Sequence, residues 1–279
     1  MENTNKIIDC FMFWNETEIL YIRLDILYNY VDYFIICECK LSHSGKIKKD
    51  EYNFIKNKQL YEKFLDKIIF ISLDDNEFKQ NGDTAKNQNI LWPNEHKQRQ
   101  WLYNEIKKFP PNTIVAISDI DEIWNPDKLP YIKNNIKMFT ICGVEQTLFY
   151  YYLNCKKTQL WRGTYFIENK NLSYDKIQLY RNERCRLPSY VDGGWHFSWI
   201  GDQTKIKEKF QCIAEHDIIN QYSNIENITD CITNIKDLFN RKDNITEILD
   251  MSSNLLPKNI KMYVEKFPQL YFTQQFSSN

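Results

Sequence analysis

The stretch TIVAISDIDEIW, from Thr113 to Trp124, decides the fold expected of this chain. Its first part, Thr113 to Ser118, is a continuous apolar run of the kind found in central parallel strands. A turn, Pro110-Pro111-Asn112, precedes it. Asp119 stands where the predicted strand ends, and ligands of open α/β sheets bind outside the carboxyl ends of the strands. A binding site is therefore expected directly after Ser118.

The residues before this stretch alternate short apolar runs with helical patterns. Three of the runs are predicted strands, at Ile7 to Phe13, Tyr33 to Cys39 and Lys67 to Leu73. Strands that alternate with helices are typical of a parallel sheet with crossover helices. The predicted fold class is therefore α/β, with a Rossmann-like, mostly parallel central sheet and flanking helices.

A helix is expected after the first predicted strand. Asn15 is suited to cap its N-terminus, with Glu18 reaching back from three positions later. Because Asn15 also lies at the exit of that strand, it is expected to line the crevice at the sheet edge as well. The apolar face of this helix is predicted to contain Ile19, Ile22, Ile26, Leu27 and Tyr30.

A second helix is predicted to begin at Asn94, after Pro93, and to run to about Lys108. Glu95 and Arg99 share one face of it with apolar residues that should point at the core. These two charged side chains are therefore expected at the mouth of a site. The alternative is an ordinary i,i+4 ion pair on the surface.

The part of the chain after residue 125 is richer in aromatic runs. Thr147 to Leu153 and Gly194 to Trp199 are predicted strands, Thr204 to His216 is a predicted helix, and helical spacing returns from Pro257 to Phe267. A mobile loop is expected earlier, from Asp74 to Asn89. Since no repeat or clear linker interrupts the sequence, residues 1–279 are expected to form a single domain.

Composition and charge exclude several classes of protein. The chain has 279 residues, 43% of them hydrophobic, and a formal net charge of -1, so no global field would draw it to nucleic acid or anionic lipid. No apolar run approaches the ~20 residues of a membrane span, and the N-terminus lacks a signal-peptide pattern. The eight cysteines contain no CxxC pair and are expected to be reduced thiols. A cytoplasmic protein without a nucleic-acid partner is predicted.

Two aspartates, Asp119 and Asp121, follow the predicted central strand. In an extended segment residues i and i+2 lie on one side, where two carboxylates repel unless a cation lies between them. Oxygen ligands of this kind suit a hard divalent ion such as Mn²⁺ or Mg²⁺, which in turn binds a diphosphate. A solvated loop is the alternative, but the buried strand before the motif favours a metal site.

Three further residues are candidates for ligand binding. His196 lies in the segment GGWHFSW, where two glycines allow close backbone approach, and it is either a third metal ligand or a core histidine. Glu38, at the end of the second predicted strand, is suited to accept hydrogen bonds from a ribose or a base, and Lys46 to approach a phosphate. A solvated strand end followed by a turn is the alternative for both.

The order of several segments carries a family resemblance. They are Asp9-Cys10-Phe11, Asn15-Glu16, Ile22-Arg23-Leu24, Ser44-Gly45-Lys46, Glu95 with Arg99, SDIDEI and GWHFSW. Together with later similar stretches they resemble glycosyltransferase family 17 over nearly the whole chain. The best-known animal members of that family add the bisecting N-acetylglucosamine to the core mannose of N-glycans.

The resemblance implies a GT-A type fold, with residues 1–125 as the nucleotide-sugar-binding half and residues 126–279 as a smaller acceptor-side region with C-terminal helices. It implies a UDP-sugar donor, UDP-GlcNAc in the animal enzymes, a divalent cation, and transfer with inversion to a glycan or glycoprotein acceptor. Asp119 and Asp121 would be the metal and diphosphate motif, with His196 a metal or phosphate contact. Asn15 and Glu38 would belong to the nucleotide pocket, and Lys46, Arg99 and Asp119 complete the predicted donor-binding set.

In the expected mechanism the cation neutralises the departing diphosphate while a carboxylate removes the proton of the acceptor hydroxyl. Asp121 is counted as catalytic through the metal, and Glu145 and Asp192 are the candidates for the base. Two other classes remain open. One is an Asp-x-Asp phosphatase, in which the first aspartate is a nucleophile. The other is a glycan-binding protein without turnover, in which Trp161, Trp195 and Trp199 face sugars.

Overall fold

The structure of the protein is a computed structural model that describes residues 5–45, 47, 51–74, 88–213, 221–242 and 244–273, with the backbone alone for residues 88–93. Three predictions fall on residues outside these ranges. They are the role of Lys46, most of the loop predicted from Asp74 to Asn89, and the end of the helix predicted to reach His216.

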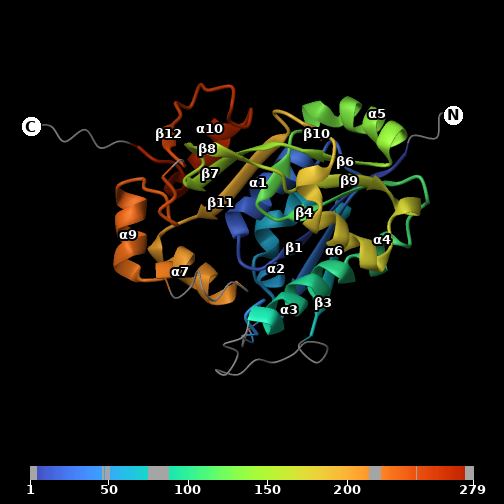
Figure 1. The fold of residues 1–279 in the computed structure, drawn as a ribbon, viewed down its shortest axis with the longest axis horizontal. Coiled ribbons are helices and arrows are strands. Elements are labelled where there is room, and N and C mark those ends of the chain that lie inside the picture. The colour runs from blue at the N-terminus through green and yellow to red at the C-terminus, as the bar shows by residue number, and fades with distance from the viewer. Residues whose placement is uncertain are drawn as a thin grey trace, which may run out of the picture.

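A seven-stranded sheet forms the centre of the fold, in the order β10-β6-β9-β4-β1-β2-β3 (Figure 1). Its strands are β1 (Ile7–Phe13), β2 (Tyr33–Cys39), β3 (Ile68–Leu73), β4 (Ile114–Asp119), β6 (Ile141–Val144), β9 (Tyr165–Glu168) and β10 (Ser189–Tyr190). From β3 through β4 the strands run parallel, whereas β9 lies antiparallel between β4 and β6. The predicted α/β class with a mostly parallel sheet is confirmed.

Helices cover both faces of this sheet, because successive residues of a strand point to opposite sides. Phe11 of β1 enters the core under α1 (Thr17–Leu27), and its neighbour Cys10 enters the core under α4 (Tyr103–Ile106) and α6 (Tyr174–Asn182). The remaining helices and 3-10 turns are α2 (Asn53–Lys56), α3 (Gln88–Trp101), α5 (Leu129–Phe139), α7 (Gln203–Cys212), α9 (Ile225–Thr233), α10 (Ile260–Lys266), η1 (Lys58–Lys67), η3 (Pro126–Lys128), η4 (Asn169–Asn171), η5 (Arg184–Arg186) and η6 (Pro268–Leu270). Within the described residues no helix is both long and apolar enough to cross a membrane.

A second, five-stranded sheet adjoins the first, in the order β12-β8-β7-β11-β5. Its strands are β5 (Glu122–Trp124), β7 (Gln146–Tyr151), β8 (Cys155–Trp161), β11 (Gly194–Ile200) and β12 (Thr246–Ile248). Helices α7 and α9 pack against it around Trp199, Phe210 and Ile228 (Figure 1). The aromatic runs predicted as strands are therefore β7 and β11.

The stretch from Thr113 to Trp124 connects the two sheets. Its first part is β4, which pairs in parallel with β1, and its last part is β5, which pairs antiparallel with β11. The sequence predicts β4 but not β5, because three residues are too few to show a periodicity. The chain passes from one sheet to the other between Asp119 and Glu122.

Three predictions about helices are wrong. Glu16, not Asn15, precedes the first turn of α1, and no side chain caps this helix. The Glu18 carboxylate accepts a hydrogen bond from Lys205 at 2.6 Å and does not reach back to the helix start. Tyr30, predicted on the apolar face, is exposed. The helix predicted from Asn94 to about Lys108 begins earlier, at Gln88, and ends at Trp101, before α4. It contains Pro93 although a proline inside a helix removes one backbone hydrogen bond.

Candidate active site

The turn from Asp119 to Glu122, called the acidic turn below, is held by Arg23 of α1. Arg23 Nη1 donates hydrogen bonds to the carbonyl oxygens of Asp119 at 2.8 Å, Ile120 at 3.1 Å and Glu122 at 3.3 Å. A guanidinium group can contact several acceptors at once because its N–H groups form a planar fork. One side chain of α1 therefore fixes the backbone that carries both predicted metal ligands.

Arg23 is in turn fixed by Asp9 of β1. Two hydrogen bonds of 2.8 Å, from Nε and Nη2, join the guanidinium to the two carboxylate oxygens, and both side chains are fully buried. Ser118 Oγ accepts a further bond from Nη2 at 2.6 Å. Such a bidentate pair is directional, and losing one partner leaves a buried charge uncompensated. The acidic turn thus rests on a buried ion pair.

Glu122 closes the acidic turn on its other side. Its carboxylate is fully buried and accepts bonds from Arg181 Nη1 at 2.7 Å and Nη2 at 2.8 Å, from Trp161 Nε1 at 2.6 Å, and from the Asp119 backbone N–H at 2.9 Å. Gly163 makes room for it, since a Cβ on Gly163 would lie 2.1 Å from the Glu122 carboxyl carbon. Glu122 therefore orients side chains of the cavity without lining it.

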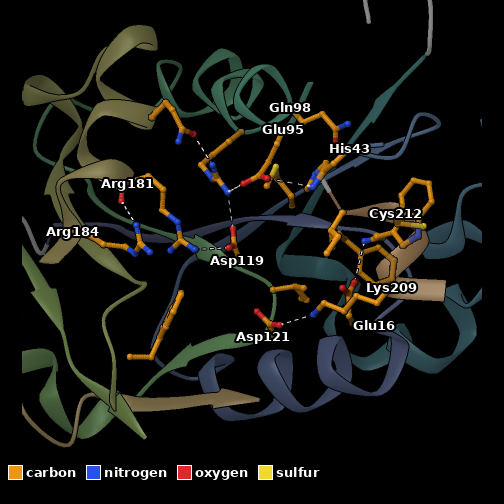
Figure 2. A pocket seen from close by; sticks show the side chains of 18 of the residues that line it. Glu16, His43, Glu95, Gln98, Asp119, Asp121, Arg181, Arg184, Lys209 and Cys212 are labelled. Atoms are coloured by element: carbon orange, nitrogen blue, oxygen red, sulfur yellow. Dashed lines mark hydrogen bonds and ion pairs between the residues drawn. The ribbon is translucent and has the colours of Figure 1, made fainter. Parts of the chain in front are cut away.

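A cavity of about 390 Å³ opens beside the acidic turn, at the carboxyl ends of β1 and β4 (Figure 2). Its other walls come from α3, from α6 with η5, and from α7. The charged and polar side chains that line it are Glu16, His43, Glu95, Gln98, Arg99, Asp119, Asp121, Gln178, Arg181, Asn182, Arg184 and Lys209. The site lies at the sheet edge that the sequence predicts.

Asp119 is held between two arginines. Its Oδ1 accepts a bond from Arg99 Nη2 at 3.0 Å, and its Oδ2 accepts one from Arg181 Nη2. Burial alone would raise the pKa of Asp119, but Arg181 and Arg99 outweigh burial and hold the pKa below its ordinary value. Asp119 is therefore an anion at neutral pH.

Asp121 has a different pair of partners. Lys209 Nζ of α7 lies 3.0 Å from Oδ2, and His196 Nε2 of β11 lies 3.5 Å from Oδ1. Burial would raise the pKa of Asp121, but Lys209 and His196 lower it below its ordinary value. The His196 ring packs against Trp161, with 4.8 Å between ring centroids, and its Nδ1 is buried without a hydrogen-bond partner.

Glu95 and Arg99 line the cavity, as predicted for a site and not for a surface pair. Arg99 is 1% exposed and donates to Glu95 Oε1 at 2.7 Å and to Gln178 Oε1 at 2.5 Å. Burial would raise the pKa of Glu95, but Arg99 and His43 lower it overall. The i,i+4 pair thus exists, but it is buried and is continuous with Asp119.

A scan against protein-family models matches residues 1–274 to the model described as glycosyltransferase family 17. The chain belongs to glycosyltransferase family 17. It is therefore a glycosyltransferase by family, and its parallel-rich sheet agrees with the GT-A type expected of such an enzyme. No curated protein matches the chain by sequence.

Several solved structures are similar to part of this family 17 chain. A 4-diphosphocytidyl-2C-methyl-D-erythritol synthase is 11% identical, with TM-score 0.38 over 68% of this chain and 90% of that one. The glucosyl-3-phosphoglycerate synthase of Mycobacterium tuberculosis, in complex with Mn²⁺, UDP and phosphoglyceric acid, is 13% identical, with TM-score 0.34 over 69% and 70%. The galactosyltransferase LgtC is 11% identical, with TM-score 0.31 over 78% and 83%. Likeness at this level transfers neither a substrate nor a metal to this chain.

The acidic turn of this family 17 chain offers hard oxygen ligands for the divalent cation that the family resemblance implies. Among the described residues no three His, Cys, Asp or Glu side chains are grouped to hold a metal. The protein would therefore supply Asp119 and Asp121, and a diphosphate and water the other ligands, which is usual for Mg²⁺. The donor set fits a cation held jointly with a substrate. Such an ion would partly replace the protein cations at these carboxylates.

Two described residues of the predicted donor-binding set, Glu38 and Asn15, are not among the lining residues of the cavity. Both oxygens of Glu38 accept bonds from the first amides of α2, from Asn53 at 2.7 Å and Phe54 at 2.9 Å, which is a structural use of the carboxylate. Asn15 lines a small neighbouring hollow together with Lys209. Lys46 lies outside the described residues. A nucleotide-pocket role for Glu38 is not supported by this placement.

The two candidates for the catalytic base do not line the cavity either. Glu145 accepts bonds from Arg162 at 3.0 Å and 3.2 Å. Asp192 is 74% exposed in its side chain and has Lys128 Nζ 3.9 Å from its carboxylate. Their role as base stays a prediction that the geometry does not favour.

Three cations that line the cavity are not predicted from the sequence. Arg181 of α6, Arg184 of η5 and Lys209 of α7, called the basic wall below, lie on segments that read as ordinary polar helix faces. A polar helix face usually indicates solvent. The one local sign is that Lys209 follows the core residue Ile206 at i+3 and so lies on nearly the same side of α7.

Proposed function

We propose that this glycosyltransferase is metal-dependent and inverting, and that it moves N-acetylglucosamine from UDP-GlcNAc to a hydroxyl of a glycan or glycoprotein acceptor. One observation carries the proposal. Asp119 and Asp121 line a single cavity at the carboxyl edge of the parallel sheet, and four cationic side chains, Arg99, Arg181, Arg184 and Lys209, line the same cavity. Carboxylates for a metal and cations for phosphate oxygens are what a nucleoside diphosphate requires.

The contacts suggest a separate role for the carboxylates and for the cations of the cavity. Asp119 and Asp121 would hold Mn²⁺ or Mg²⁺, which when bound neutralises charge on the leaving diphosphate. Arg99, Arg181 and Lys209 keep both carboxylates ionised and in place, since each lies within 3.0 Å of one of them. Fixed charges that need no rearrangement during the reaction are an efficient way to stabilise a leaving anion.

Glu16 is proposed to accept a hydrogen bond from the nucleoside. It follows β1 in the predicted nucleotide-binding half, and its Oε2 accepts bonds from the backbone N–H groups of Trp14 at 3.3 Å and Asn15 at 3.1 Å. Within the described part of the chain no cation lies in ion-pair range of it. A carboxylate of this kind at a sheet edge suits a ribose hydroxyl.

The test is a donor screen. The protein is incubated with Mn²⁺ and a panel of UDP- and GDP-sugars, and release of nucleoside diphosphate is measured with and without glycan acceptors. UDP-GlcNAc is expected to be the preferred donor. Turnover is expected to disappear on addition of EDTA and in an Asp119→Ala, Asp121→Ala double variant.

The control for this screen is Asp127→Ala, which removes a carboxylate that pairs with Lys258 on the surface. It should leave turnover unchanged. Release from no donor in the panel, or release that survives in the double variant, would contradict the proposal.

A further inference from the structure

Arg184 differs from the other arginines and the lysine that line the cavity, because no carboxylate of the described residues pairs with it. Arg99 pairs with Glu95 and Asp119, Arg181 with Asp119 and Glu122, and Lys209 with Asp121. In the described part of the chain no Asp or Glu oxygen lies within ion-pair distance of Arg184. Among the described residues, the cavity therefore contains one permanent positive charge that has no carboxylate partner.

The hydrogen bonds of Arg184 lead to the same conclusion. Its Nη1 donates to the backbone carbonyl of Arg181 at 3.0 Å, and its Nε is buried without a partner. A guanidinium has five N–H groups, and buried donors are nearly always satisfied in folded proteins. Burial, with the nearby charge of Arg181, lowers the pKa of Arg184. An anionic ligand would relieve the repulsion from Arg181 and could accept bonds from the Nη N–H groups that have no hydrogen-bond partner among the described residues.

Trp161 holds the Arg184 guanidinium in a defined orientation. The guanidinium carbon lies 5.1 Å from the centroid of the Trp161 ring, and the indole N–H is anchored on Glu122 at 2.6 Å. Stacking on an aromatic face leaves the N–H edge of an arginine free for ligands and reduces the entropy lost on binding. In Figure 2 Arg184 lies across the cavity from Glu16 and Lys209, with Asp119 between them.

We infer that Arg184 is the residue through which the cavity binds an oxyanion of the phosphate type. The planar fork of a guanidinium matches two oxygens of a phosphate. The oxyanion is either the diphosphate of the donor or an anionic group on the acceptor, and the two sources share this chemistry. The inference rests on the proposed transferase function, because it places a substrate group in the same cavity.

Binding is measured by calorimetry with Mn²⁺, using UDP and uridine as probes, in the wild type and in Arg184→Gln. Loss of a charge-assisted, two-point contact is expected to raise the Kd of UDP about tenfold or more while the Kd of uridine stays the same. That result assigns the oxyanion to the donor. Arg184→Lys should lose part of the affinity, since it keeps the charge but not the fork.

A second arm identifies an acceptor-side oxyanion. The UDP-saturated protein is titrated with inorganic phosphate. Binding by the wild type and not by Arg184→Gln, with UDP affinity unchanged, assigns the oxyanion to the acceptor side. The matched control is Arg186→Gln, which removes an exposed arginine two positions along, paired with Glu183, and should change neither titration.

Equal binding of UDP and of phosphate by the wild type and Arg184→Gln overturns the inference. If the Asp119→Ala, Asp121→Ala variant at the same time loses turnover, the transferase proposal stands and the assignment of Arg184 alone is wrong. Should Arg184→Gln fold poorly, labelling of arginines in the wild type with phenylglyoxal, mapped by mass spectrometry, replaces it. UDP or phosphate should then protect Arg184 and not Arg186, and labelling that neither ligand reduces contradicts the inference.

Discussion

The acidic turn and the basic wall meet in one cavity but are built in opposite ways. The acidic turn is four consecutive residues, and three of its carbonyls accept hydrogen bonds from one buried arginine, Arg23. The basic wall is three side chains from α6, η5 and α7, and two of them, Arg181 and Lys209, are positioned by the carboxylates that they contact. Hydrogen bonds to backbone carbonyls therefore fix the position of the acidic turn, and ion pairs between side chains fix most of the basic wall.

Removing Arg23 tests how the backbone of the acidic turn is held, and it should have the largest effect on stability. Arg23→Met leaves Asp9 as a buried charge without its partner and frees three carbonyls of the acidic turn. We expect the free energy of unfolding to fall by about 3–5 kcal/mol, measured by urea denaturation.

Lys63→Met is the control for Arg23→Met, because it breaks an ion pair on the surface that also involves α1, with Asp25. It should cost no more than about 1 kcal/mol. If the two variants lost similar stability, the acidic turn would not depend on the buried pair.

Glu122→Gln tests the link between the acidic turn and the basic wall. The variant weakens the hold on Arg181 and on Trp161, so we expect a loss of about 2 kcal/mol in the free energy of unfolding, again from urea denaturation. UDP affinity should fall as well, because both partners line the cavity. Glu168→Gln, at a partly exposed pair with Lys170, is the control and should change neither quantity. Unchanged stability in Glu122→Gln would show that the basic wall is positioned by other contacts.

Acid pH tests the ion pairs that join the basic wall to the acidic turn. The lowered pKa of Asp121 means that its ion pairs stabilise the fold above about pH 4, the ordinary value, and that this stabilisation is lost as the pH falls toward the lowered pKa. In Lys209→Met the loss of stability between pH 5 and pH 2 should be smaller than in the wild type by about 1–2 kcal/mol. Asp119 and Glu95 contribute with the same sign in both proteins. Parallel pH profiles would mean that Lys209 does not hold Asp121.

Glu145→Gln should have the smallest effect. The carboxylate pairs with a partly exposed arginine, Arg162, and does not line the cavity, so we expect less than about 1 kcal/mol in stability and nearly unchanged turnover. Stability and turnover are measured on the same preparation. A large loss of turnover at unchanged stability would restore Glu145 as the base.

The sequence predicts the acidic turn and most of the parallel strands because both leave local patterns. An apolar run followed by Asp119 and Asp121 is visible in twelve residues, and β1, β2 and β4 are found within one residue of their predicted bounds. The place of Glu95 and Arg99 beside the cavity is also predicted, because this charged pair lies on a helix face that apolar residues should occupy, although the predicted bounds of the helix are wrong.

The basic wall leaves no such pattern. Arg181 and Lys209 bond to carboxylates 62 and 88 positions away in the chain. Whether a polar side chain on a helix faces water or a cavity is decided by what packs opposite, and a single sequence does not show that. Glu38 is the reverse case. The sequence predicts this carboxylate at a binding site, but both of its oxygens accept hydrogen bonds from backbone amides of α2.

The space beside Gly163 has a consequence for changing this enzyme by design. The Glu122 carboxylate occupies the place where a side chain at position 163 would begin, so positions 122 and 163 share one volume. In a library that varies one position at a time, every larger residue at position 163 would collide with Glu122, and every shorter residue at position 122 would leave a cavity beside Gly163. Only paired substitutions can explore this part of the protein, and they would do so without altering the surface of the cavity directly.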